Sequence, residues 1–188
     1  MLRTKIKKDI RLRVLPSLIT YTNMILGITA IWLSFTLDIK NIKISCILVI
    51  MAAVADKIDG LVARKLNLTS KFGKELDSLC DLVSFGLAPI IIWWHLNPNN
   101  YEVLEMVVSL LFIGAGIFRL ARFNVEKDDN YIIGLPITIA GSIVVFKLFI
   151  DINYRFQPGT WLFNENIVLL TLLSIFMVSR IRIKRPNI

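Results

Sequence analysis

The chain has 188 residues, of which 55% are apolar and 19% charged, and its mean hydropathy is +0.66. This composition is more apolar than that of a soluble domain of the same length and is typical of an integral membrane protein. The net charge is +8, but the sequence predicts no water-exposed basic surface of the kind that binds nucleic acid. The sequence therefore argues against a nucleic-acid-binding protein.

Six apolar stretches are long enough to be membrane-spanning helices. They cover residues 14–37, 42–63, 76–96, 103–118, 132–150 and 161–179. The predicted fold class is an all-α integral membrane protein, with one transmembrane domain (14–179) between a basic N-terminal arm (1–13) and a basic tail (180–188). The arm interleaves apolar residues with its charges, so it is either a short amphipathic helix on the membrane surface or a solvated arm.

The 22 basic residues predict the orientation of the spans. Most of them fall on one side: in the arm, between the second and third spans, after the fourth span and in the tail. The other side has Lys40, Lys43 and Arg155, and Lys147 falls inside the fifth span, where its side chain is expected to reach the interface. By the positive-inside rule, both termini face the cytoplasm, which an even number of spans requires. We therefore expect a multi-pass protein of the cell membrane.

A run of acidic and small residues follows the middle of the second span. It reads Asp56-x2-Asp59-Gly60-x2-Ala63-Arg64-x8-Gly73-x3-Asp77-x3-Asp81. Carboxylates are costly in or near a bilayer, so four of them at set spacings indicate a functional site. Spacings of three and four residues place the first part on one face of the second helix and the last part on one face of the third. The acids then lie at the cytoplasmic boundary, within reach of water and a polar headgroup.

These residue types predict a metal and phosphate site. Clustered carboxylates need a compensating cation, and ligands that are all oxygen suit hard ions such as Mg²⁺, Mn²⁺ or Ca²⁺. Two such ions commonly bridge carboxylates and a substrate phosphate. The small residues beside the acids leave room for a flat base or a ribose, and Arg64 has the geometry to pair with a phosphate. Together they describe a cavity for a metal-bound nucleotide diphosphate.

At each defined position the run resembles the motif of the CDP-alcohol phosphatidyltransferases, integral membrane enzymes of phospholipid synthesis. The resemblance implies that the acids hold one or two divalent ions, Mg²⁺ or Mn²⁺ with Ca²⁺ as a possible occupant: Asp56, Asp59, Asp77 and Asp81. It implies that the small residues accommodate cytidine and ribose, with an arginine on a phosphate: Gly60, Ala63, Gly73 and Arg64. It also implies that Asp81 is the general base when an alcohol hydroxyl displaces CMP.

Three further stretches resemble the serine-using branch of this family, the smaller integral-membrane phosphatidylserine synthases of bacteria and archaea. They are residues 15–20 (LPSLIT) with Asn23, residues 77–89 (DSLCDLVSFGLAP), and residues 119–124 (RLARFN) followed by Gly134-Leu135-Pro136. This branch implies a CDP-diacylglycerol-type lipid, or its archaeal ether counterpart, and L-serine as substrates. The family is also typically homodimeric.

Polar residues at the end of the fourth span each have two candidate roles. Arg119 and Arg122, an i, i+3 pair, either hold the serine carboxylate or a substrate phosphate, or only anchor the helix end at the membrane. Asn124 either bonds to the amino acid or caps the helix.

The same holds for the first and third spans. Ser84 and Phe85 either line the acceptor pocket or only pack between helices. Thr20 and Asn23 either contact the diphosphate or ribose, or form hydrogen bonds between helices.

Two other functions stay open from the sequence. Within the family, the acceptor could be glycerol phosphate or an inositol phosphate, and Arg119 with Arg122 would suit either. A divalent-ion transporter is the alternative from another class, but it predicts acids spread along a pathway, whereas these acids lie at one end. A lipid-binding scaffold without catalysis would not need Asp81 beside three metal ligands.

Overall fold

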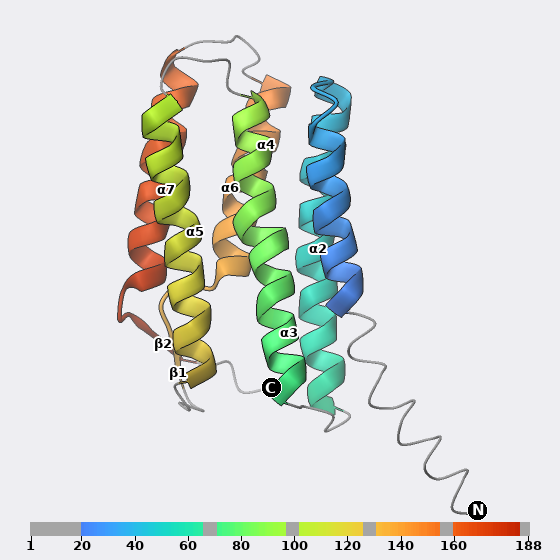
Figure 1. Cartoon of the computed structure of the whole chain (residues 1–188), viewed down its shortest axis with the longest axis vertical. Coiled ribbons are helices and arrows are strands. Elements are labelled where there is room, and N and C mark those ends of the chain that lie inside the picture. Colours follow the sequence, from blue (N-terminus) through green and yellow to red (C-terminus); the bar gives the residue numbers. More distant parts are fainter. Residues whose placement is uncertain (1–19, 66–70, 97–101, 126–130, 155–159, 185–188) are drawn as a thin grey trace, which may run out of the picture.

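A computed structural model of the chain describes residues 20–65, 71–96, 102–125, 131–154 and 160–184. These segments form a bundle of helices aligned along one axis (Figure 1). In chain order the elements are a helix over residues 20–34, α2 (Ile39–Lys65), α3 (Lys71–Asp81), the π-helical turn η1 (Leu82–Leu87), α4 (Ala88–Leu96), α5 (Glu102–Val125), β1 (Tyr131–Ile133), α6 (Ile137–Tyr154), α7 (Thr160–Val178) and β2 (Arg182–Lys184). The segments α3, η1 and α4 follow one another without a break.

The predicted helical architecture is confirmed for these residues. Two stretches, Phe72–Leu96 and Val103–Val125, are long and apolar enough to cross a membrane by length and composition. Large apolar side chains are also exposed on several helices, including Trp32, Leu110 and Ile175. Apolar surface of this extent on a folded chain indicates contact with a membrane.

Two predicted boundaries are wrong. The fourth apolar stretch was expected to end at residue 118, but α5 continues to Val125, because no glycine or proline interrupts the sequence that follows. The polar residues 119–124 therefore lie on the last turns of a helix. The fifth stretch was expected to begin at residue 132, but α6 begins at Ile137, after Gly134 with φ +73° and Pro136.

The structure also contains a two-stranded ribbon that was not predicted. Strand β1 pairs antiparallel with β2, with Ile132 opposite Ile183. Two further backbone bonds extend this junction, from Gly134 N to Ile181 O at 2.9 Å and from Leu135 N to Phe176 O at 3.1 Å. The described part of the basic tail, residues 180–184, thus closes one end of the bundle beside the start of α6 (Figure 1).

The buried core lies along the π-helical turn. Phe85, in η1, is fully buried. On α6, Gly141 faces it so closely that an added Cβ would lie 2.5 Å from Phe85 O, which lets the two backbones touch. Along the remaining length, α5 packs on α7 and α2 packs on α6.

At the opposite end of the bundle from the ribbon, Lys147 forms ion pairs. Its ammonium group contacts Asp151 one turn along α6 and lies 3.5 Å from Glu165 of α7. Lys147 was expected to extend to the membrane interface. The two carboxylates provide a nearer partner, because Lys147 and Asp151 lie in the second half of α6 and Glu165 lies in the first half of α7.

Candidate active site

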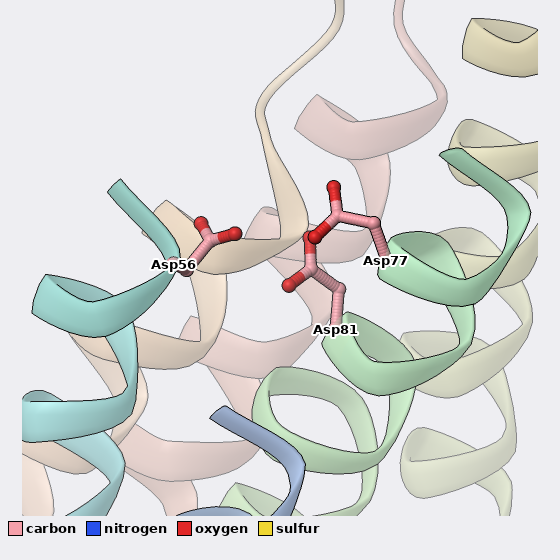
Figure 2. Close-up of side chains that lie close together, drawn as sticks. All are labelled: Asp56, Asp77 and Asp81. Atoms are coloured by element: carbon pink, nitrogen blue, oxygen red, sulfur yellow. The ribbon is translucent and has the colours of Figure 1, made fainter. Parts of the chain in front are cut away.

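Three of the four predicted acids come together at the end of the bundle where the ribbon lies. Asp56 projects from α2, and Asp77 and Asp81 project from adjacent turns of α3 (Figure 2). Their carboxylates point toward one another, and one oxygen from each lies within 4.8 Å of the others. The spacing of four residues on α3 was correctly predicted to place Asp77 and Asp81 on one face.

This triad fits a hard divalent cation. Asp81 is buried, and Asp56 and Asp77 are half-buried, so water screens their negative charges only weakly. Three carboxylates in so small a volume repel one another and favour a multivalent cation among them. Since the ligand atoms are all oxygen, ions such as Mg²⁺, Mn²⁺ or Ca²⁺ match the site better than zinc does.

The other residues of the acidic run are described in part. Asp59, Ala63 and Arg64 lie in the last turns of α2, but their side chains fall outside the described part of the structure, so their predicted roles stay predictions. Gly60 is exposed, and among the described residues no atom beyond its own stretch of α2 lies within 4 Å of the place where a Cβ would be. The packing of the described residues therefore does not require a glycine at position 60. Gly73 lies in the first turn of α3.

Asn23 contacts the triad from the first helix. Its Nδ2 donates a hydrogen bond to Asp81 Oδ1 at 3.1 Å, and the side chain is buried. Of the two predicted roles, the structure thus supports a hydrogen bond between helices. Thr20, one turn earlier, is also buried.

Thr138 contacts the triad from α6 and was not predicted. Its hydroxyl donates to Asp56 Oδ2 across 3.4 Å, a long hydrogen bond. The residue lies in the first turn of α6, two positions after Pro136. A threonine early in a helix is common, so no spacing in the sequence marks this one as part of the site.

Arg119 supplies positive charge beside the acids. Its side chain is buried and interacts electrostatically with Asp81 and Asp56. Its guanidinium carbon lies 5.5 Å from the centroid of the Phe123 ring, which Lys74 Nζ approaches to 5.6 Å. Among the described residues, Arg119 Nε has no hydrogen-bond partner. A buried guanidinium with an unused donor is suited to bind an anion.

Arg122, predicted as its partner, has a different environment. Its Nη1 donates to Val178 O at 3.1 Å, and its Nη2 lies within hydrogen-bond distance of backbone oxygens of β1 and of the end of α7: Ile133 O at 3.2 Å, Met177 O at 3.3 Å and Ser179 O at 3.1 Å. The last carbonyls of a helix lack partners within it and carry partial negative charge, which a guanidinium neutralises. Arg122 thus joins α5 to α7 and the ribbon, a role that neither predicted alternative included.

Gly134 is required where this arginine lies. Its φ of +73° is in the left-handed region, and an added Cβ would lie 2.4 Å from Met177 O and 2.7 Å from Arg122 Nη2. The absence of a side chain at position 134 therefore lets the arginine and the end of α7 meet.

We expect Arg122→Ala to lower the stability of the protein by about 1–3 kcal/mol, because several charge-assisted hydrogen bonds to exposed and part-buried carbonyls are lost. Thermal unfolding in detergent measures the change. Arg180→Ala is the matched control, since Arg180 is an exposed arginine near the same ribbon. If both variants are equally stable and Arg122→Ala has a raised KM for the acceptor, Arg122 binds the acceptor and the structural role is wrong.

The last two predicted acceptor residues form contacts between helices. Asn124 Nδ2 donates to Glu75 Oε2 at 3.1 Å and to Ser78 Oγ at 3.0 Å, which joins α5 to α3. Neither predicted role of Asn124 included this bridge. Ser84 Oγ donates to Asn23 O at 3.1 Å, so the packing alternative fits Ser84.

The fold and site define a class of protein: a helical membrane protein with a hard-cation site at one end of its bundle. Comparison with known families gives the class its name. The sequence model of the CDP-alcohol phosphatidyltransferases matches residues 13–177, and the chain belongs to this family. The predicted family is therefore confirmed.

Curated relatives in bacteria and archaea share most of this chain. A protein of Helicobacter pylori strain J99 is 39% identical over 172 residues, which cover 89% of this chain and 70% of the relative. One from Methanocaldococcus jannaschii is 36% identical over 171 residues, 90% of this chain and 73% of the relative. One from Bacillus subtilis is 35% identical over 136 residues, which cover 72% of this chain and 75% of the relative. Each is named CDP-diacylglycerol–serine O-phosphatidyltransferase.

Proposed function

We propose that this protein transfers the phosphatidyl group of a CDP-linked diradylglycerol, with ester or ether chains, to the hydroxyl of L-serine and releases CMP. The observation that carries the proposal is the convergence of Asp56, Asp77 and Asp81 from two helices in a member of this family. The names of its relatives, at 35–39% identity over most of the chain, favour serine as the acceptor.

In this proposal the triad and Asp59 hold one or two divalent ions, Mg²⁺ or Mn²⁺. Bound ions would neutralise the diphosphate and the charge that develops on CMP as it leaves. Asp81 takes the proton from the serine hydroxyl as its oxygen bonds to the lipid-side phosphorus and the bond from that phosphorus to CMP breaks.

The CDP-lipid occupies the space beside α2. Gly60, where an added Cβ would have no neighbour among the described residues, lies against the cytidine or ribose. Ala63 and Gly73 complete this surface, Arg64 pairs with a phosphate, and Thr20 contacts the nucleotide from the first helix. The proposed topology is six spans across the cytoplasmic membrane, with both termini and the acid cluster on the cytoplasmic side. The proposed assembly is a homodimer.

Arg119 is the proposed ligand of the serine carboxylate. It is buried beside the triad with an unused donor, whereas Arg122 binds backbone carbonyls. We expect Arg119→Ala to raise the KM for serine at least about tenfold, the equivalent of one charge-assisted hydrogen bond. Arg119→Lys should recover only part of the loss, because an ammonium group cannot form the paired contacts of a guanidinium.

Steady-state kinetics with either substrate varied tests the role of Arg119. An unchanged KM for serine combined with a raised KM for the CDP-lipid would place Arg119 on the diphosphate instead.

A direct test of the reaction is CMP release by purified protein in detergent. CDP-diacylglycerol and Mg²⁺ or Mn²⁺ are supplied with serine, glycerol phosphate or an inositol phosphate in parallel. The proposal requires release with serine and labelled phosphatidylserine as the product. Release with glycerol phosphate or an inositol phosphate and none with serine would overturn the acceptor assignment while leaving the family chemistry in place.

A further inference from the structure

Asn23 forms two hydrogen bonds with the segment that contains Asp81. Its side-chain Nδ2 donates to Asp81 Oδ1 at 3.1 Å, and its main-chain oxygen accepts from Ser84 Oγ at 3.1 Å. Asn23 and Ser84 are at most 1% exposed. One residue of the first helix thus binds both the carboxylate and the turn that follows it.

The helix segment after Asp81 is irregular. It is the π-helical turn η1, which begins at Leu82 and contains Ser84. π-Helical turns are rare and occur frequently at functional sites. In this turn the backbone departs from α-helical geometry directly after the carboxylate that Asn23 holds, so contacts from outside the helix have to fix its position.

Gly27 allows the first helix to reach this turn. It lies one helical turn after Asn23, and an added Cβ would lie 2.4 Å from Ser84 Oγ and 2.8 Å from Ser84 Cα. The two backbones therefore approach as closely as a glycine allows. We name this set of contacts, made by Asn23, Gly27 and Ser84, the N-helix lock.

We propose that Asn23 is a positioning residue for Asp81, and that the N-helix lock fixes the carboxylate in the orientation used at the cation site. The amide occupies Oδ1 and so leaves the other oxygen for an ion or a substrate proton. Partners that orient ligand groups in this way typically change metal affinity or activity by about 10- to 100-fold when they are removed. The inference rests on the proposed role of Asp81 at the metal site.

The alternative is that Asn23 binds the nucleotide directly. Its Oδ1 is buried and has no partner among the described residues, so an additional donor could reach it only from a ligand or water. The two roles differ in what they change. A positioning residue alters ion affinity and kcat, whereas a nucleotide ligand alters the KM for the CDP-lipid.

The test is Asn23→Leu, which keeps the branching and the heavy-atom count of the side chain, is somewhat larger, and removes the amide. The Ser84 bond survives because it uses the main-chain oxygen of residue 23. We expect Mn²⁺, titrated by electron paramagnetic resonance without substrate, to bind about tenfold more weakly, and kcat for CMP release to fall by about 10- to 100-fold. The KM for the CDP-lipid should stay near the wild-type value, whereas the unfolding temperature without metal should fall modestly, because the buried Asp81 Oδ1 loses a donor.

Ser45→Ala is the matched control for loss of a buried polar group. Ser45 is fully buried, and its hydroxyl bonds to Asn41 O within its own helix, away from the triad. It should leave Mn²⁺ affinity and kcat unchanged. If Asn23→Leu does not fold, Asn23→Ser serves as the second variant, since it is smaller and its hydroxyl is too short to reach Asp81.

The outcomes separate this inference from the proposed function. If the wild type does not release CMP with serine but Asn23→Leu weakens Mn²⁺ binding, the acceptor is wrong and the positioning role stands. If the wild type is active and the variant matches it in both Mn²⁺ affinity and kcat, the positioning role is overturned. A raised KM for the CDP-lipid with unchanged Mn²⁺ affinity would assign Asn23 to the nucleotide.

Discussion

Asp81→Asn is expected to lower CMP release by at least about a thousandfold, since it removes the proposed general base and one proposed ion ligand together. The same change should raise the unfolding temperature of the metal-free protein, because Asp81 is buried beside the like charges of Asp56 and Asp77. The new amide keeps an oxygen that can accept from Asn23, so the hydrogen bond between the helices is retained. Activity and stability should therefore change in opposite directions.

Asp151→Asn is a control matched in burial. Asp151 and Asp81 are both 8% exposed, but Asp151 pairs with Lys147 at the other end of the bundle. Its replacement should lower the unfolding temperature and leave CMP release nearly unchanged. Thermal scans with and without Mn²⁺ complete the test, because added Mn²⁺ should stabilise the wild type and Asp151→Asn but not Asp81→Asn. A stabilising effect of Mn²⁺ on Asp81→Asn equal to that on the wild type would remove Asp81 from the ion site.

Gly60→Ala is expected to reduce kcat/KM for the CDP-lipid by at least about a hundredfold, because the added methyl enters the space proposed for cytidine or ribose; misplacement near the reacting groups can cost this much. The fold should tolerate it, because in the described part of the chain the new Cβ at position 60 would have no packing neighbour within 4 Å. Alanine is also the better helix former, by about 0.8–1 kcal/mol. The variant should thus be at least as stable as the wild type and poorly active.

Gly114→Ala isolates the effect of ligand space. Gly114 is also a helical glycine whose added Cβ would have no neighbour within 4 Å, but it lies in the middle of α5. Both variants should gain similar stability, and only Gly60→Ala should lose affinity for the CDP-lipid. Equal activity of the two would mean that the nucleotide does not lie against Gly60.

The helices were the predictable part of the fold, since long apolar stretches cover most of them. Their ends were less predictable. Charged residues after Phe118 suggested a loop, but helix formers continue α5 to Val125. The ribbon could not be predicted, because β1 and β2 have three residues each and lie at distant points of the chain. The π-helical turn likewise depends on contacts with other helices.

The acid cluster was predictable because Asp77 and Asp81 share a face through local spacing, and the family resemblance supplied Asp56 across the loop. Contacts between distant segments were not. Asn23 is 58 residues from Asp81, and Thr138 is 82 residues from Asp56. Arg122 differs from Arg119 by one helical turn, and only the packing of α7 distinguishes the half-buried arginine that links helices from the buried arginine suited to bind an anion.

The pairing of β1 with β2 has a consequence for the order in which a cell makes this protein. Every residue of the triad is synthesised before α4, yet the backbone oxygens that Arg122 binds at residues 177–179 and the strand that pairs with β1 come near the end of the described chain. During translation, Arg122 and β1 therefore lack their hydrogen bonds to the end of α7 and to β2 until the ribosome has released residues 182–184. A nascent chain that stalls in α7 would contain every residue of the acid triad but would lack the contacts that join Arg122 and β1 to the end of the chain.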